Sequence, residues 1–188
     1  MSKTAFVLLD LQVGILERVK DGTTNYLSRV SEAIKASRAA GIPIIYVKTC
    51  FRAGHPEVSS RNFSAAKIAS FGSFVEGDAP VEISPEVAPL KSDIVVTKRR
   101  VSAFSGSDLD VVLRGLNVDS LVLAGVATSG AVLSTVRQAA DLDFSLTVIG
   151  DLCLDLDAEV HKVLVEKIFS RQARTLSTEE WIQGLSKE

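Results

Sequence analysis

Six short, nearly continuous apolar runs recur along the chain and limit the folds that it can adopt. They span residues 5–9, 42–47, 94–97, 121–124, 146–149 and, more weakly, 173–176. A strand covered by helices on both faces is apolar throughout, whereas a strand with one face in water alternates apolar and polar residues. The runs therefore predict a parallel sheet that is buried on both sides.

Segments of helical periodicity separate these runs. Helices are predicted over residues 26–40, 108–114, 158–169 and 178–185. Gly41 ends the first of them, and Ser107 stands at an N-cap position with Asp110 in the capping-box place. Ser177 opens the last helix, with Glu180 placed to reach back. The alternation predicts a three-layer α/β/α fold, doubly wound around a Rossmann-like parallel sheet of about six strands.

Length and charge narrow the class of protein. The 188 residues, of which 46% are hydrophobic, suit one domain with a buried core, so we expect a single domain over residues 1–188. The 21 basic residues nearly balance the 23 acidic ones and are scattered, except at Lys98, Arg99 and Arg100. This pattern is unlike a nucleic-acid interface. The apolar N-terminal run is too short for a signal peptide or a membrane span, and we expect a cytoplasmic protein without membrane contact.

Two cysteines and two histidines are the residues most often used as nucleophiles and metal ligands. Cys50 and Cys153 are too few for a disulfide framework and are expected to be reduced thiols. Either could be a nucleophile near the sheet edge, but a small buried side chain is the favoured interpretation. His55 lacks companion ligands, and we expect His161 to lie on the surface of a helix. We predict no metal and no cofactor.

Polar side chains follow several of the predicted strands, and ligands of open parallel sheets bind at that edge. Asp10 comes directly after the apolar run over residues 5–9, and Lys98 follows the third strand. Burial raises the pKa of a carboxyl group while a nearby ammonium lowers it, so the two side chains could form a proton-transfer pair. A structural ion pair, or Asp10 capping the next turn, is the alternative interpretation.

The stretch "GVATSGAV", residues 125–132, joins the fourth strand to a helix. Backbone amides at the start of a helix point outward without internal partners, so Ser129 to Val132 are a candidate oxyanion seat. The stretch is not a phosphate-binding loop, because Ala131 and Val132 stand where that loop has Lys and Ser or Thr. A glycine-rich turn needed only for close packing remains the alternative.

Residues 51–90 form the one long segment with no sustained period. Loops of this length in compact domains act as lids, binding loops or partner contacts. Candidates for lining a pocket or contacting a neighbouring subunit are Arg52, Arg61, Phe63, Phe71 and Phe104. Gln12, two residues after Asp10, is a further candidate for substrate binding.

The chain resembles the isochorismatase-like hydrolase superfamily, which includes nicotinamidases, N-carbamoylsarcosine amidases and other cysteine hydrolases. The resemblance runs over nearly the whole chain, in the order "AFVLLDLQ", "FRAGHPEVSSRN", "VVTKRRVSAFSGSDLDVVLRGL", "LVLAGVATSGAVLSTVRQAADLDF" and "VIGDLC". It implies that Asp10 is the acid/base aspartate and Lys98 its lysine. It also implies a cis peptide at Val126–Ala127 and oxyanion donation by the amides of Ala127 and Ala131.

The sequence departs from the cysteine hydrolases at one position, because Ala131 occupies the place of their nucleophile. Isochorismatases also manage without that cysteine: their aspartic acid protonates a vinyl ether, and water captures the resulting cation. The resemblance thus implies a cysteine-independent hydrolase of a small polar or anionic metabolite, active as a dimer or tetramer. Two alternatives stay open: an inactive ligand-binding or scaffold member of the family, and an amidase-type cysteine hydrolase whose nucleophile has been replaced by Ala131.

Overall fold

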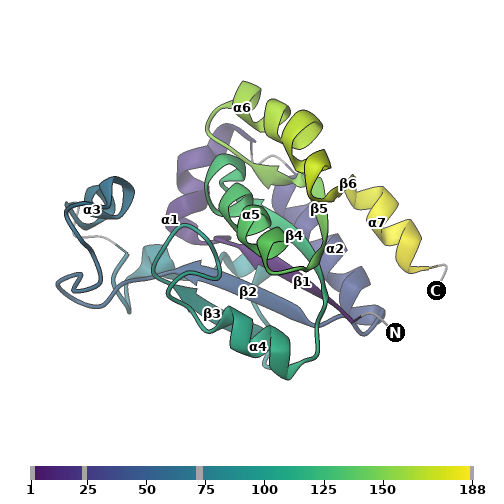
Figure 1. Ribbon diagram of the computed structural model, residues 1–188, viewed down its shortest axis with the longest axis horizontal. Coiled ribbons are helices and arrows are strands. Elements are labelled where there is room, and N and C mark those ends of the chain that lie inside the picture. Colours follow the sequence, from purple (N-terminus) through teal and green to yellow (C-terminus); the bar gives the residue numbers. More distant parts are fainter. Residues whose placement is uncertain (1–2, 23–24, 71–73, 187–188) are drawn as a thin grey trace.

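A computed structural model of the protein describes residues 3–22, 25–70 and 74–186, and in them it contains a sheet of six parallel strands (Figure 1). The strands are β1 (Thr4–Leu9), β2 (Ile44–Thr49), β3 (Ile94–Lys98), β4 (Ser120–Val126), β5 (Ser145–Leu154) and β6 (Arg174–Leu176). Their spatial order, β3-β2-β1-β4-β5-β6, is that of the Rossmann fold. The predicted doubly wound α/β architecture is confirmed.

Helices cover both faces of this sheet. They are α1 (Val13–Leu16), α2 (Tyr26–Ala39), α3 (Phe63–Ser70), α4 (Leu109–Gly115), α5 (Leu133–Asp141), α6 (Ala158–Val163) and α7 (Thr178–Leu185). Residues of α4 and α5 share one hydrophobic core with the side chains on one face of β1, such as Val7. Residues of α1, α2 and α7 pack with the opposite face, which presents Phe6 and Leu8. Two cores on one sheet explain why its strands are apolar throughout.

The helix boundaries agree with the sequence patterns at most ends. Helix α7 spans the predicted residues, and the capping box between Ser177 and Glu180 is present. Helix α4 begins at Leu109, one residue later than expected, and the Ser107 hydroxyl still accepts a hydrogen bond from the Leu109 amide. Asp110 pairs with Arg114 one turn along the helix instead of reaching back to the cap. The expected helix over 158–169 continues from α6 as a π-helical turn over Leu164–Ile168.

Two helices were not expected from the sequence. Helix α1 and the 3₁₀ turn over Glu17–Gly22 follow β1, and α3 lies inside the long segment 51–90. Helix α3 stands out from the sheet at one end of the molecule (Figure 1). One or two turns of helix are too short to show a clear hydrophobic period, which is why periodicity alone missed them.

Gly125 brings the ends of β4 and β1 unusually close together. Its backbone has φ +134°, and a Cβ atom at this position would fall 2.1 Å from the carbonyl oxygen of Leu9. Only glycine fits there. In the parallel register Leu9 lies beside Gly125 and Val47, and Thr49 lies beside Lys98. The residues that follow these positions therefore meet at one edge of the sheet.

Candidate active site

Asp10 and Lys98 form a buried ion pair at that edge. The Lys98 Nζ lies 2.9 Å from the Asp10 Oδ2, and the two side chains are only 3% and 6% exposed. The residues come from β3 and from the end of β1, which are separated by β2. Strands lie about 4.8 Å apart, so the long lysine side chain is needed to cross the intervening strand. The sequence-predicted pairing of these residues is present in the structure.

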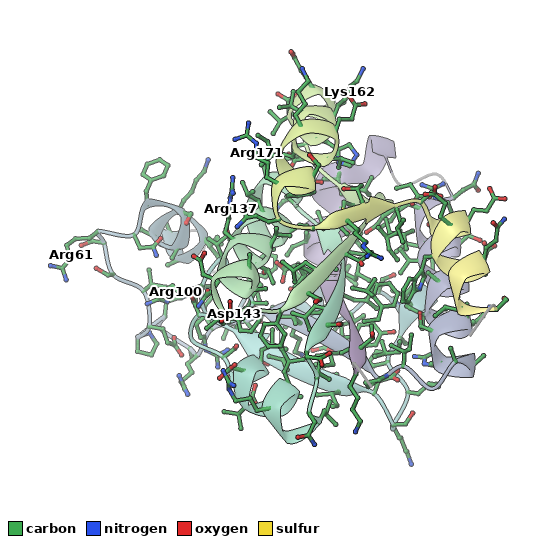
Figure 2. The ribbon with its side chains drawn as sticks, turned by 45° about the vertical axis from the view of Figure 1, so that its right-hand side comes forward. Arg61, Arg100, Arg137, Asp143, Lys162 and Arg171 are labelled. Atoms are coloured by element: carbon green, nitrogen blue, oxygen red, sulfur yellow. The ribbon has the colours of Figure 1, made fainter. Side chains whose placement is uncertain are left out.

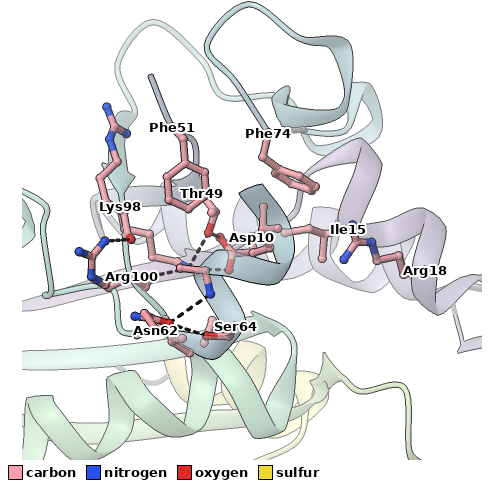
Figure 3. Close-up of a pocket in the computed structure, with 15 residues that line it drawn as sticks. Asp10, Ile15, Arg18, Thr49, Phe51, Asn62, Ser64, Phe74, Lys98 and Arg100 are labelled. Atoms are coloured by element: carbon pink, nitrogen blue, oxygen red, sulfur yellow. Dashed lines mark hydrogen bonds and ion pairs between the residues drawn. The ribbon is translucent and has the colours of Figure 1, made fainter. Parts of the chain in front are cut away.

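Thr49, the last residue of β2, lies between the two charges (Figure 3). Its hydroxyl accepts a hydrogen bond of 2.6 Å from the Lys98 ammonium and donates one of 3.1 Å to the Asp10 Oδ1. The ammonium also donates to the carbonyl oxygen of Arg100 at 3.1 Å. A lysine ammonium group can donate three hydrogen bonds, and Asp10, Thr49 and Arg100 accept all three. Lys98 is thus fixed in place by the protein itself.

The surroundings of Asp10 favour its protonated form. Burial raises the pKa of this carboxyl group, and the Lys98 charge and the hydrogen bonds from Lys98 and Thr49 only partly offset that effect. The backbone of Asp10 is left-handed, with φ 54°. Asp and Asn adopt this conformation more readily than other non-glycine residues, so the position suits a carboxylate sterically as well as chemically.

The turn after β4 has the expected cis peptide bond between Val126 and Ala127. The expectation of unpartnered amides from Ser129 to Val132 is wrong for three of the four. The Ser129 amide donates to the Asp155 carboxylate at 2.6 Å, and the amides of Gly130 and Val132 donate to the Ala127 carbonyl. The turn closes on itself as a π-helical segment, Thr128–Val132, and this consumes donors that an open helix start would present.

A pocket of about 170 Å³ opens above the ion pair (Figure 3). Asp10, Thr49 and Lys98 line it together with Ala131, so the strand ends and the turn share one cavity. Helix α3 and the residues before it cover one side. Asn62 begins that helix by accepting a hydrogen bond from the Ala65 amide at 3.1 Å. The long segment 51–90 therefore contributes to the pocket, as the sequence suggested.

Much of the pocket wall is apolar or basic. The apolar side chains include Ile15, Phe51, Ile68, Phe74 and Val101, and the basic ones are Arg18, Lys98, Arg99 and Arg100. Thr49 and Arg18 were not singled out from the sequence. The signal for Thr49 was the end of the second apolar run, because every strand of a parallel sheet delivers its last residues to the same edge.

Gln12, Arg52 and Phe104 do not line the pocket. The buried Gln12 amide is fully engaged, since its Nε2 donates to the carbonyls of Thr49 and Val81 and its Oε1 accepts from the Thr49 amide, each at 2.8 Å. Gln12 thereby holds the backbone of Thr49 in place. Arg52 is exposed and pairs with Glu57. Phe104 belongs to the core and packs against Phe144.

The remaining candidates of the long segment lie elsewhere. Arg61 points into solvent from the loop before α3 (Figure 2), and the Phe63 side chain, the first of that helix, is also exposed. Neither lines the pocket. Phe71 lies outside the residues that the structure describes.

Neither cysteine has the surroundings of a nucleophile. Cys50 and Cys153 are each 1% exposed and form no disulfide. Burial raises the pKa of both thiols, that of Cys153 to about 12, so both stay protonated and unreactive at neutral pH. Neither lines the pocket.

His161 is half-buried rather than on the surface as expected. Its Nδ1 forms a hydrogen bond of 2.8 Å with the hydroxyl of Thr128, a fully buried residue of the turn after β4. Burial lowers the pKa of His161, and the charge of Asp155 only partly opposes that shift. The neutral imidazole therefore ties α6 to the turn.

The lengths of the helices and the spacing of the acidic, histidine and cysteine side chains bear on membrane and metal binding. Within residues 3–22, 25–70 and 74–186, every helix is too short or too polar to cross a bilayer. Across these same ranges, no three His, Cys, Asp or Glu side chains gather closely enough to hold a metal ion.

Comparison with known proteins gives the family. The model of the isochorismatase domain matches residues 4–180. The chain is 31% identical over 192 residues to YecD, an uncharacterized isochorismatase family protein of Escherichia coli O157:H7, covering 97% of this chain and 96% of that protein. It is 28% identical over 171 residues to the ureidoacrylate amidohydrolase RutB of Stutzerimonas stutzeri, covering 80% of this chain and 69% of that one.

A solved structure shows the same fold. The cysteine hydrolase from Pseudomonas syringae pv. phaseolicola superimposes with a TM-score of 0.90 at 22% identity, over 98% of this chain and 93% of that one. Together with the family match over nearly all of the sequence, the common fold settles the classification. The chain belongs to the isochorismatase family of hydrolases.

Proposed function

We propose that the protein hydrolyses a small polar or anionic metabolite without forming a covalent bond to any side chain. Asp10 is the proton donor or base, Lys98 its electrostatic partner, and the amides of Ala127 and Ala131 are the oxyanion donors. One observation carries the proposal: a buried, hydrogen-bonded pair of Asp10 and Lys98 faces a pocket that is also lined by Ala131, the residue at the expected position of the nucleophile.

The ion pair has the parts that a general acid needs. Thr49 donates its only hydroxyl proton to the Asp10 Oδ1, so Oδ2 is the carboxyl oxygen that can carry a proton. Oδ2 also faces the Lys98 ammonium at 2.9 Å, so this oxygen lies within hydrogen-bond reach of a proton donor. Burial raises the pKa of the Asp10 carboxyl group, which favours its protonated form.

Hydrolysis of an enol ether uses such an acid directly. Asp10 gives its proton to the terminal methylene carbon, and the carbon bearing the ether oxygen becomes an oxocarbenium ion next to the new carboxylate. Water adds to that carbon and returns a proton to the Asp10–Lys98 pair. The hemiketal then breaks into a ketone and an alcohol. No thiol takes part, which agrees with alanine at position 131.

A turnover screen tests the proposal. The chain is incubated with isochorismate and other small enol ethers, and pyruvate release is coupled to lactate dehydrogenase; amides and carbamoyl compounds are followed by NMR. We expect at least one compound to be hydrolysed, and Asp10→Asn to lose the activity by about 10²- to 10⁴-fold. Absence of any turnover above the Asp10→Asn background would reject the proposal.

Amide hydrolysis through a restored thiol is the second candidate. Two observations favour it: Ala131 lines the same pocket as Asp10 and Lys98, and RutB is an amidohydrolase. The test is release of ammonia from the amide panel by the wild-type chain and by Ala131→Cys. Activity that appears only with the restored cysteine supports this candidate over the first. Ligand binding without turnover by either chain supports a binding or scaffold role.

A further inference from the structure

The charges around the pocket do not balance. Four basic side chains line it, from Arg18, Lys98, Arg99 and Arg100, against the single carboxylate of Asp10. Lys98 is neutralised by Asp10. Arg99 is neutralised by Glu57 and Glu76, at 3.1 and 2.8 Å. Two positive charges remain, those of Arg18 and Arg100.

The two remaining guanidinium groups differ in what they already bind. Arg100 donates to the carbonyl oxygens of Arg99 and Glu57, at 2.6 and 2.8 Å, and so ties the end of β3 to the segment before α3. The Arg18 guanidinium forms no hydrogen bond or ion pair with any residue in the described part of the chain. Its guanidinium instead lies over the ring of Phe74, 5.5 Å from the ring centre. Its donors are available to a ligand.

Arg18 also lies at the right place along the pocket. Asp10 and Lys98 are almost completely buried, whereas Arg18 is exposed, so the pocket runs from a buried floor to a rim in contact with water. Figure 3 shows Arg18 beyond Ile15 and Phe74, on the side away from Lys98 and Arg100. A ligand that reaches from Asp10 to Arg18 would pass along apolar side chains.

We propose that Arg18 is a specificity-determining residue that binds a carboxylate group of the substrate at the rim of the pocket. The apolar body of the substrate packs against Ile15, Ile68 and Phe74, and the reacting end lies at Asp10. The flat guanidinium can offer a carboxylate two parallel N–H donors while its face stays on the Phe74 ring. This inference rests on the proposed function only in placing the substrate in this pocket, and it narrows the substrate class to carboxylates with an apolar body.

The test compares two ligands of nearly equal shape. Phenylacetate and phenylacetamide differ mainly in charge, and both match the apolar wall. Their dissociation constants are measured by NMR titration for the wild-type chain, Arg18→Gln, Arg18→Lys and Arg61→Gln. Arg61→Gln is the matched control, since Arg61 lies in the neighbouring loop, is exposed and does not line the pocket.

We expect the wild-type chain to bind phenylacetate about tenfold more tightly than phenylacetamide, as a charge-assisted contact implies. Arg18→Gln removes that preference by weakening phenylacetate alone, Arg18→Lys keeps part of it, and Arg61→Gln keeps all of it. Raising the salt concentration weakens phenylacetate binding only.

Three results overturn the proposal: equal affinity of the wild-type chain for both ligands, no saturable binding of phenylacetate, or an equal loss for both ligands in Arg18→Gln. The last would show that Arg18 only supports Phe74. Because the experiment measures binding, it can support the role of Arg18 even if the turnover screen finds no activity. If the protein hydrolyses a substrate but binds phenylacetate no more tightly than phenylacetamide, only the role of Arg18 is rejected.

Discussion

Lys98 reaches across a complete strand to bind Asp10, with 2.9 Å between its Nζ and the carboxylate Oδ2. The strand it crosses supplies Thr49, whose hydroxyl contacts both charged groups. Each charge has lost nearly all contact with water, and such pairs contribute little net stability because desolvation costs about as much as the attraction returns. An ion pair that stabilises the fold so little is better explained by the chemistry of the pocket it faces.

Breaking the pair from one side is expected to destabilise the protein. Asp10→Asn keeps a residue that tolerates the left-handed backbone but leaves the Lys98 charge buried without its partner, which costs about 3 kcal/mol. Lys98→Met leaves a buried carboxyl group that is neutralised by taking up a proton. The double variant Asp10→Asn/Lys98→Met removes both charges. The free energies of unfolding are measured with urea at neutral pH. We expect the double variant to be at least 1 kcal/mol more stable than the sum of the two single losses predicts. Simple additivity would mean that the two charges do not interact.

Thr49 is expected to set the pH dependence of the reaction. Its hydrogen bond lowers the pKa of Asp10 by favouring the carboxylate. If Asp10 acts as an acid, activity falls as the pH rises through the pKa of Asp10 in the folded protein. Thr49→Val removes the bond and raises that pKa, so the alkaline limb of kcat/KM should move to higher pH. The pH profile is measured with any compound that the screen identifies.

Thr97→Val is the control for that profile, because Thr97 lies on β3 next to Lys98 but does not line the pocket. Its alkaline limb should coincide with that of the wild-type chain. A limb that moves to lower pH in Thr49→Val would contradict the role of Asp10 as the acid.

The native protein is expected to have no reactive thiol, although it contains two cysteines. Cys50 and Cys153 are buried and have raised pKa values, so neither forms a thiolate readily. The folded wild-type chain should not react with Ellman's reagent at neutral pH, whereas Ala131→Cys should gain one reactive thiol in the pocket. Both chains are titrated again after denaturation, to count the buried cysteines. Rapid reaction of the folded wild-type chain would show that one of its own cysteines is accessible.

The contact between His161 and Thr128 predicts a pH-dependent stability. Because burial lowers the pKa of His161 in the folded protein, the unfolded chain takes up this proton first as the pH falls below about 6.5. The free energy of unfolding should therefore decrease between pH 7.5 and 5.5. His161→Asn keeps an acceptor for the Thr128 hydroxyl but does not titrate, so its decrease should be smaller. The free energies of unfolding of the wild-type chain and of His161→Asn are measured by urea titration at both pH values. Equal decreases in the two chains would mean that other groups cause the pH dependence.

His161→Ala provides the matching structural control. It leaves the hydroxyl of the fully buried Thr128 without its partner, at a cost of about 1–3 kcal/mol at either pH. If His161→Ala loses stability and His161→Asn does not, then the hydrogen bond to Thr128, and not the bulk of the imidazole ring, holds the turn in place.

The sequence predicted the parts of the site that lie at strand ends. Asp10 and Lys98 follow apolar runs, and parallel strands must deliver such residues to one edge of the sheet. The resemblance to the family added the expectation of a cis peptide bond at Val126–Ala127 and the interpretation of Ala131 as the residue at the nucleophile position. The sequence did not indicate that Gln12 would be used to hold Thr49, nor that His161 would be drawn inward by Thr128. Both contacts join residues more than thirty positions apart and depend on side-chain packing that no local pattern encodes.

The amino-acid sequence by itself predicted the class of fold, because short apolar runs that alternate with segments of helical period favour a buried parallel sheet with helices on both sides. It also determined that the turn after the fourth strand, residues 125–132, contains no cysteine. Only the tertiary structure decided which polar groups meet in one cavity, that the Lys98 ammonium binds Asp10, Thr49 and Arg100, and that the Arg18 guanidinium lies over the ring of Phe74. The reason is physical: strand patterns follow from neighbours along the chain, whereas hydrogen-bond partners and burial follow from neighbours in space.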